Sequence, residues 1–204
     1  MRTQGLPRPG APEIAFVGRS NAGKSSAINV LCQRRRLAFA SKTPGRTQAL
    51  NFFALGPADQ EPSAYLVDTP GYGYAATPQA VRHGWDALAG HYLGARSSLA
   101  GVVVVLDSRR GVTALDHQML RFVPQHLPLL ALLTKSDKLG FAERGRVRET
   151  VARDVDATYR HRDLTLIAFS ANTGLGVDPV RELLESWASP GGQKKSPAAS
   201  TAGE

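Results

Sequence analysis

Residues 18–25 read Gly-Arg-Ser-Asn-Ala-Gly-Lys-Ser and match the phosphate-binding pattern G-x-x-x-x-G-K-[ST] at every fixed position. An apolar run, Glu13 to Val17, precedes this loop, and a helical pattern, Ser26 to Leu31, follows it. Such a loop turns backbone N–H groups toward an anion at a helix N-terminus, where the helix dipole also attracts negative charge. We expect Lys24 to reach the β- and γ-phosphates of a nucleotide and the Ser25 hydroxyl to bind Mg²⁺. The alternative is a glycine turn with a purely structural role, so the downstream motifs decide.

A second motif follows an apolar strand candidate, Ala64 to Val67. Asp68 comes directly after that run and is followed by Thr-Pro-Gly71. A carboxylate in this position can hold a Mg²⁺-bound water, and the Gly71 N–H can contact a γ-phosphate. Alone, Asp68 would be read as the cap of a turn. Together with the upstream loop, it predicts a nucleoside triphosphate site.

The stretch Thr134-Lys-Ser-Asp137 follows another apolar strand candidate. A carboxylate at Asp137 can accept the N1–H and the exocyclic N2–H₂ of guanine as a pair, with the stem of Lys135 along the ring. Adenine lacks the N1–H, and a site built to satisfy such donors rejects the analogue without them by about 10⁴–10⁵. Ser170-Ala171, after the last strand candidate, would offer a backbone N–H to guanine O6. These spacings predict a preference for guanine.

The loop between the first helix and the second strand contains Lys42-Thr-Pro-Gly-Arg-Thr47. A threonine hydroxyl here can complete the Mg²⁺ shell only while a γ-phosphate is present, which makes the loop an order–disorder switch. Spacing alone does not choose between Thr43 and Thr47.

Strand and helix patterns alternate along the chain and predict the elements that position these motifs. Three helices are expected over Val112 to Phe122, around Val147 to Val155, and from Asp178-Pro179 to Trp187. Another helix opens at Thr77-Pro78 and carries apolar residues to Tyr92. The strands expected after the phosphate loop are 52–55, 64–67, 101–106, 127–134 and 164–169.

This order predicts an α/β fold, a three-layer doubly wound phosphate-loop architecture with a six-stranded, mostly parallel sheet and one antiparallel edge strand. Residues 52–55 and 64–67 form the antiparallel hairpin at that edge. We expect a flexible segment over 1–12, one nucleotide-binding domain over 13–188 and a disordered tail over 189–204, where Ser, Gly, Pro, Ala and Lys predominate.

The 204-residue chain carries a formal net charge of +8. Between residues 14 and 57 there are seven Lys or Arg residues and no Asp or Glu, and Arg34-Arg35-Arg36 exceed what nucleotide phosphates require. A polyanionic partner and a solvated basic face explain that triplet equally well.

A single cysteine excludes an internal disulfide, five histidines show no zinc spacing, and no apolar run is long enough to cross a bilayer. We therefore expect a cytoplasmic protein without a signal peptide or a membrane partner.

The sequence resembles the TRAFAC-class translation-factor-like GTPases, and within them the EngB family of ribosome-assembly GTPases. The resemblance rests on Gly-Arg-Ser-Asn-Ala-Gly-Lys-Ser-Ser26, on Pro-Gly-Arg-Thr-Gln48 followed by Leu50-Asn51-Phe52, and on Asp-Thr-Pro-Gly-Tyr-Gly-Tyr-Ala75. It covers Glu13 to about Trp187. It implies GTP contacts at Gly18, Arg19, Ser20, Asn21, Ala22, Gly23, Lys24, Ser25, Gly45, Arg46, Thr47, Gln48, Ala49, Asp68, Thr69, Pro70, Gly71, Thr134, Lys135, Ser136, Asp137, Phe169, Ser170 and Ala171.

The resemblance also implies Mg²⁺ ligation by Ser25 and Thr47, with Asp68 acting through a water, and catalytic roles for Lys24, Thr47 and Gly71. It implies a monomeric factor that binds GTP or GDP and helps to mature the large (50S) ribosomal subunit and its rRNA. A linked requirement for normal cell division and septation belongs to the same expectation.

One position departs from the Ras-like pattern, in which a glutamine that orients the attacking water follows Asp-x-x-Gly. This chain has Tyr72 there, so we expect slow intrinsic hydrolysis, about 10⁻⁴–10⁻³ s⁻¹. Asn21 is a candidate K⁺ site, because related GTPases with asparagine at this loop position bind K⁺ there in place of an arginine finger. The alternative is that Asn21 only braces the loop.

Tyr72, Tyr74 and Trp85, with Arg34–Arg36 and Lys42, outline a candidate surface for RNA or ribosomal protein, although core packing also explains Trp85. Two classes of function remain open. One is an enzyme whose GTP hydrolysis times its release from a ribosomal precursor, and the other is a nucleotide-gated binding module with negligible turnover that acts in division away from the ribosome. An ATPase is a weaker third option, since Asp137 argues against it.

Overall fold

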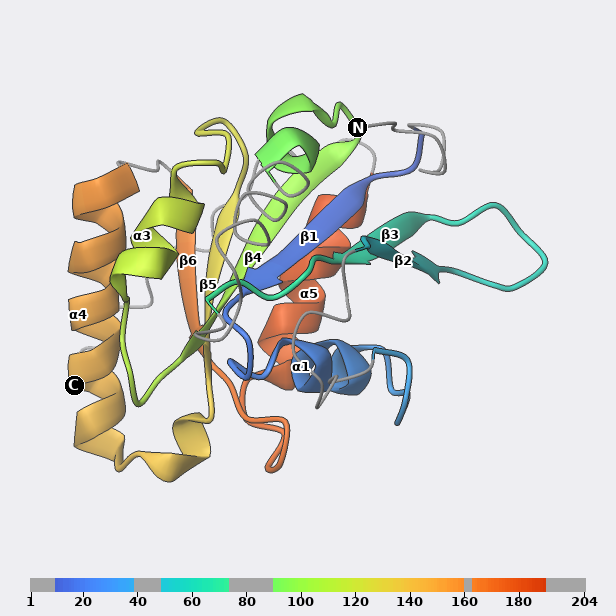
Figure 1. Ribbon diagram of the computed structural model, residues 1–204. Coiled ribbons are helices and arrows are strands. Elements are labelled where there is room, and N and C mark those ends of the chain that lie inside the picture. Colours follow the sequence, from blue (N-terminus) through green and yellow to red (C-terminus); the bar gives the residue numbers. More distant parts are fainter. Residues whose placement is uncertain (1–9, 39–48, 74–89, 160–162, 190–204) are drawn as a thin grey trace, which may run out of the picture.

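A single six-stranded sheet, in the order β2-β3-β1-β4-β5-β6, organises the chain (Figure 1). The computed structural model describes residues 10–38, 49–73, 90–159 and 163–189. The strands are β1 (Glu13–Gly18), β2 (Asn51–Leu55), β3 (Ala64–Asp68), β4 (Leu99–Asp107), β5 (Leu129–Thr134) and β6 (Leu164–Ala168). The helices are α1 (Lys24–Leu31), α3 (Ala114–Leu120), α4 (Phe141–Tyr159) and α5 (Val177–Ala188), with a short 3₁₀ turn η1 (Ser136–Lys138) and helical residues at 90–95.

The sheet confirms the predicted fold class. β2 and β3 pair antiparallel, with Phe53 opposite Leu66, and all other neighbouring strands are parallel. β1 and β4 are buried along nearly their whole length, as expected for central parallel strands covered on both faces. The carboxyl ends of β1, β3, β4, β5 and β6 therefore meet at one edge of the sheet, where ligands bind in such folds.

Alternating side chains of the strands supply two separate cores. Helices lie on both faces of the sheet and cover them (Figure 1). On one face, Phe16 and Leu132 lie in a cluster with α1 and α5. On the other face, Val104 and Leu133 lie in a cluster with α3, α4 and the helical residues at 90–95. This arrangement is the predicted three-layer architecture, and it fixes the strand ends on which the site depends.

The helix predicted over 112–122 is shorter than expected. Thr113 caps α3, because its backbone N–H and hydroxyl both donate to the Asp116 carboxylate. The helix ends at Leu120, and Phe122, predicted to lie on its apolar face, is 37% exposed. Pro124 prevents the helix from continuing, since it has no N–H to donate to the carbonyl of residue 120 and disfavours helical backbone in Val123 before it.

The last helix begins before the predicted Asp178-Pro179 start. Gly176, with φ of 75°, is the N-cap, and Val177 is the first helical residue. Pro179 is then the third residue of α5, where the missing N–H costs nothing because the first N–H groups of a helix have no internal acceptor. The predicted start of the helix at Thr77-Pro78 lies outside the described residues.

A buried ionic cluster closes the end of the sheet opposite the strand carboxyl ends. The Glu13 carboxylate is 1% exposed and accepts hydrogen bonds from the Tyr92 hydroxyl at 2.9 Å, from the Arg96 guanidinium and from Ser98 Oγ at 2.8 Å. Burial and the adjacent carboxylate raise the pKa of Tyr92, which keeps its hydroxyl a donor. The cluster ties the start of β1 to the helical residues at 90–95.

Across the described residues, no helix combines the length and the apolar character that a bilayer crossing requires. β1 begins at Glu13 and α5 ends at Ala188. The domain limits drawn at 12/13 and 188/189 stay predictions, and residues 1–9 and 190–204 lie outside the described part of the chain.

Candidate nucleotide-binding site

The phosphate loop connects β1 to α1 through backbone conformations that its residue types permit. A Cβ on Gly18 would lie 2.9 Å from the Val105 carbonyl oxygen of β4, so only glycine fits where the loop leaves the sheet. Gly23, with φ of 101°, is the N-cap of α1, and Asn21 also has a positive φ of 65°. Asparagine tolerates this left-handed backbone better than most residues. The loop therefore delivers Lys24 and Ser25 as the first two residues of α1.

The turn after β3 lies directly against this loop. The Ser20 N–H donates to the Tyr72 carbonyl at 2.9 Å, and the Tyr72 N–H donates to the Gly18 carbonyl at 3.3 Å. A Cβ on Gly71 would lie 3.2 Å from the Ser20 backbone, which leaves little room for any side chain there. The Thr69 hydroxyl donates to the Phe16 carbonyl at 2.9 Å and anchors the turn to β1. The structure thus brings residues 68–71 together with the phosphate loop, as their motif order predicts.

The Lys24 ammonium lies between the two motifs. It forms an ion pair with the Asp68 carboxylate and donates to the Thr69 carbonyl at 2.6 Å. Both Lys24 and Asp68 are nearly buried, at 9% and 4% exposed, so this pair is shielded from bulk water. Phosphates of a bound nucleotide would therefore compete with Asp68 for the lysine.

The turn after β5 is bound to the phosphate loop from the other side. The Thr134 hydroxyl lies 2.5 Å from the Ala22 carbonyl oxygen and 3.0 Å from that of Leu106. Lys135, with a positive φ of 59°, donates from its ammonium to the Asn21 carbonyl at 2.8 Å. The last residue of β5 and the residue that follows it therefore hold two successive carbonyls of the phosphate loop.

The turns after β5 and β6 lie side by side and carry the predicted guanine contacts. The Ser136 N–H donates to the Phe169 carbonyl at 3.1 Å, and the Phe169 N–H donates to the Leu133 carbonyl at 2.8 Å. Asp137 lies in η1, where a hydrogen bond from the Ser170 side chain lowers the pKa of its carboxyl. Asp137 is therefore an anion at neutral pH and has only acceptors to offer, which suits the N1–H and N2–H₂ donors of guanine.

Sequence reasoning missed one residue at this edge of the sheet, Asp107, which ends β4. Its carboxylate accepts from the Lys135 ammonium at 2.8 Å and from two guanidinium nitrogens of Arg109, at 2.9 and 2.7 Å. The hydrogen bonds from Arg109 and then from Lys135 hold the pKa of Asp107 well below its usual range. Its position directly after an apolar strand, as for Asp68, is the signal that would have identified it.

The interpretation of Tyr72 as part of an exposed aromatic surface is wrong. Its side chain is buried, at 6% exposed, because it packs in the core next to α3 and its hydroxyl donates to Asp116 at 2.6 Å. Burial and the adjacent carboxylate raise the pKa of Tyr72 well above its usual value. Arg34, Arg35 and Arg36 are exposed, as expected, whereas Lys42, Tyr74 and Trp85 lie outside the described residues.

The remaining predicted contacts separate into two groups. Gly45, Arg46, Thr47 and Gln48 lie outside the described residues, and Ala49 is exposed just before β2. Ser170 is almost fully buried after β6, and Ala171 packs against the core beside α1.

No cluster of three or more His, Cys, Asp or Glu that could hold a metal occurs among the described residues. The hydroxyl of Ser25 with the single carboxylate of Asp68 fits Mg²⁺, which is held by few protein ligands together with phosphates and waters.

The doubly wound sheet, the loop before α1, the carboxylate after β3 and the paired turns after β5 and β6 define a phosphate-loop GTPase. The sequence pattern of the family described as "50S ribosome-binding GTPase" matches residues 13–135. A probable GTP-binding protein EngB from Burkholderia ambifaria is 52% identical over 190 residues, covering 91% of this chain and 86% of that protein. A probable EngB from Paraburkholderia phytofirmans is 49% identical over 199 residues, covering 95% and 91%. This chain belongs to the EngB family of GTP-binding proteins.

Solved structures agree on the fold. The crystal structure of a probable GTP-binding protein engB superposes with a TM-score of 0.65 at 19% identity, covering 86% of this chain and 98% of that one. Era in complex with MgGDPNP and a 16S ribosomal RNA fragment superposes with a TM-score of 0.64 at 19% identity, covering 86% and 56%.

Proposed function

We propose that this protein binds GTP with Mg²⁺ and hydrolyses it slowly, and that the bound nucleotide switches its association with the large ribosomal subunit. The observation that carries the nucleotide assignment is the position of Asp137. It is an ionised carboxylate in the turn after β5, hydrogen-bonded to Ser170 in the turn after β6, at the edge of the sheet that also holds the phosphate loop.

Each group then has a defined role. Backbone N–H groups of residues 18–25 and the Lys24 ammonium bind the phosphates, and the Gly71 N–H contacts the γ-phosphate. Asp137 selects guanine, Lys135 lies along the base, and the Phe169–Ala171 turn contacts its O6. Mg²⁺ held by Ser25 and Thr47, with Asp68 acting through a water, would neutralise charge that develops on the phosphates.

Hydrolysis is expected to be slow because the residue after the Asp-x-x-Gly turn cannot orient water. The Tyr72 hydroxyl is engaged with Asp116, and it is buried in the core beside α3. We propose that K⁺ at Asn21 assists the reaction, since asparagine occupies the phosphate-loop position at which related GTPases bind K⁺. Turnover measured in KCl and in NaCl at equal ionic strength tests this role, and equal rates would refute it.

Calorimetry on an Asp137→Asn variant tests the guanine assignment. The asparagine amide cannot accept both donors of guanine, so GTP should bind about 10²-fold more weakly or worse. Xanthosine triphosphate, which has a carbonyl in place of the N2 amine, should gain affinity because the amide N–H₂ can donate to it. Asp178→Asn is the matched control, since that carboxylate is 87% exposed on α5. Equal binding of GTP and ATP to the unaltered protein would overturn the proposal.

The ribosomal part of the proposal is supported by the description of the matched family and by the exposed arginines at 34–36. In this proposal the GTP-bound protein joins a large-subunit precursor and leaves it after hydrolysis, and normal division and septation depend on that step. Co-sedimentation with large-subunit particles in the presence of a non-hydrolysable GTP analogue, GDP or no nucleotide tests it. Binding that ignores the nucleotide would contradict the switch.

A nucleotide-gated binding module that acts in division away from the ribosome is the second candidate, favoured by the burial of Tyr72. Single-turnover hydrolysis with and without large-subunit particles separates the two. Acceleration by the particles supports the assembly factor, whereas negligible turnover in both conditions supports the binding module.

A further inference from the structure

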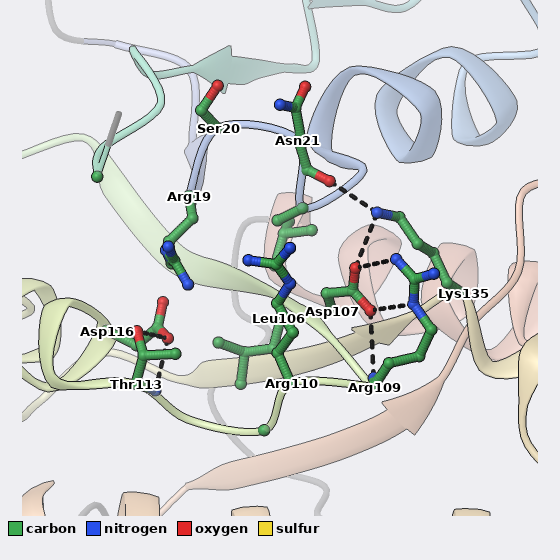
Figure 2. Close-up of a pocket in the computed structure, with 14 residues that line it drawn as sticks. Arg19, Ser20, Asn21, Leu106, Asp107, Arg109, Arg110, Thr113, Asp116 and Lys135 are labelled. Carbon is green, nitrogen blue, oxygen red and sulfur yellow. Dashed lines mark hydrogen bonds and ion pairs between the residues drawn. The ribbon is translucent and has the colours of Figure 1, made fainter. Parts of the chain in front are cut away.

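A cavity of about 330 Å³ lies between the phosphate loop and the segment that joins β4 to α3 (Figure 2). Arg19, Ser20 and Asn21 line it from the phosphate loop, and Arg110 and Thr113 line it from the 107–113 segment. Lys24, Ser25, Asp137 and Ser170 do not line it. Its lining shares Arg19, Ser20, Asn21, Ala22 and Lys135 with the predicted GTP contacts, so the cavity adjoins the proposed GTP site on the side of the 107–113 segment.

The carboxylates of the cavity already accept hydrogen bonds from neighbouring groups, and Asp107 is also paired with two cations. Asp107 is bound by Arg109 and Lys135, and Asp116 accepts from the Tyr72 hydroxyl and from the backbone and hydroxyl of Thr113 (Figure 2). Among the described residues, the lining contains four basic and two acidic side chains, an excess of two positive charges. A cavity with this balance favours an anion.

Arg19 and Arg110 are the two basic side chains of this lining that take no part in the ion pairs of Asp107. Their side chains extend into the cavity from opposite walls (Figure 2). No hydrogen bond or ion pair joins either guanidinium to another described residue, and the Nε of Arg19 is a buried donor without an acceptor. Like charges that share a partly enclosed space repel one another, and a buried donor without an acceptor costs free energy. An oxyanion between the two guanidinium groups would offset their repulsion.

We propose that this cavity binds a phosphate group, held by the guanidinium groups of Arg19 and Arg110. Arginine matches phosphate because its planar donors address two oxygens at once. The group is either a phosphodiester of an RNA backbone or a free phosphate, and the site takes both by the same contacts. The proposal goes beyond the proposed function and does not depend on hydrolysis.

The test follows the Nε–H NMR signals of arginine side chains in the full-length protein saturated with MgGDP, which occupies the phosphate loop. Calorimetry confirms saturation beforehand, so a failure to bind GDP is recognised as a failure of the proposed function. Sodium phosphate is titrated against sodium chloride at equal ionic strength, and a short single-stranded RNA is titrated separately. We expect saturable shifts of the Arg19 and Arg110 signals with at least one of the two probes.

Arg110→Gln should weaken that binding by about tenfold, since it removes one of two charge-assisted contacts. Arg146→Gln, in an exposed position on α4 outside the cavity, is the matched control and should leave it unchanged. Stronger binding of RNA than of phosphate identifies a backbone phosphodiester, and binding of phosphate alone identifies a free oxyanion. The proposal is overturned if neither probe shifts the two signals, or if Arg110→Gln binds as tightly as the unaltered protein.

Discussion

Single hydrogen bonds next to the phosphate loop determine which side chains there are buried and which elements they connect. Asp116 both caps α3 and accepts the Tyr72 hydroxyl, so one carboxylate connects the turn after β3 to a helix on the adjacent face. The Asp107 carboxylate likewise has two partners, since it forms ion pairs with Lys135 in the turn after β5 and with Arg109. Each of these bonds leads to a measurable prediction.

Removing the Tyr72 hydroxyl should destabilise the fold. Tyr72→Phe loses a buried hydrogen bond to a carboxylate while Asp116 keeps its bonds from Thr113, so the free energy of unfolding should fall by about 1–2 kcal/mol. Urea denaturation measures the change. Tyr65→Phe is the control, since the half-buried Tyr65 hydroxyl makes no hydrogen bond with the described residues. Equal losses in the two variants would contradict this account.

Asp107 should make stability depend on acid pH. Its pKa is depressed in the folded state, first by Arg109, so its contribution is fully present above the unfolded value of about 3.9 and is lost as the pH falls below it. Asp107→Asn should therefore be less stable by about 1–2 kcal/mol at pH 7, and the difference should shrink below about pH 4. Thermal melts across this range test the prediction, with Asp178→Asn as the exposed control. A difference that stays constant with pH would refute it.

The sequence predicts which residues gather at this edge better than it predicts their partners. Lys24, Asp68, Lys135 and Asp137 follow strand ends, and parallel strands must bring those ends together. The burial of Tyr72 was not predictable in this way, because it depends on an acceptor 44 residues away in α3. Asp107 was overlooked because it belongs to none of the nucleotide-binding motifs, although its position resembles that of Asp68.

At the scale of elements, packing distances between strands and helices explain which glycines are required. A Cβ added to Gly101 of β4 would overlap the indole ring of Trp187 on α5. By contrast, nothing lies within 4 Å of a Cβ at Gly145 in the exposed part of α4. The two glycines therefore differ in role, one in a close approach and the other in an open helix position.

Alanine at these two glycines should have opposite effects. Gly101→Ala should destabilise the protein by about 1–3 kcal/mol, because α5 must move away from the sheet. Gly145→Ala should stabilise it by about 0.5–1 kcal/mol, because alanine favours the helix. Chemical denaturation of the two variants provides the comparison. A stabilised Gly101→Ala protein would show that the sheet and α5 can accept a methyl group beside Trp187.

Strand positions follow from the sequence more closely than helix ends do. Continuous apolar runs locate β4, β5 and β6 to within two residues at each end. The starts of α3 and α5 differ from prediction because they are set by the capping box of Thr113 and Asp116 and by the left-handed backbone of Gly176, which apolar periodicity does not report.

At the scale of the whole molecule, the distribution of positive charge determines which surface would bind a polyanion. The formal net charge is +8, and three consecutive exposed arginines, Arg34 to Arg36, follow α1. Asn29 anchors this segment, since its amide pairs with both backbone groups of Ala38, at 2.9 and 2.7 Å. The arginines are therefore presented from a loop that is tied back to α1.

Replacing Arg34, Arg35 and Arg36 together by glutamine should weaken binding to large-subunit particles. The slope of log affinity against log salt concentration should also become shallower, by about one for each phosphate that the variant no longer neutralises. The same change at the exposed residues Arg146, Arg148 and Arg153 of α4 is a control of equal charge. Sedimentation over a series of salt concentrations measures both, and identical slopes for the two triple variants would refute a specific role for residues 34–36.

The contacts of Thr134 and Lys135 with the Ala22 and Asn21 carbonyls have a consequence for nucleotide exchange. The same two residues belong to the proposed base-recognition turn and hold the phosphate loop, so a displacement of that turn would also displace the loop. A partner protein that displaced the turn after β5 would weaken the contacts to the base and to the phosphates at the same time. Exchange catalysts for this protein therefore need not touch the phosphates to speed the release of GDP.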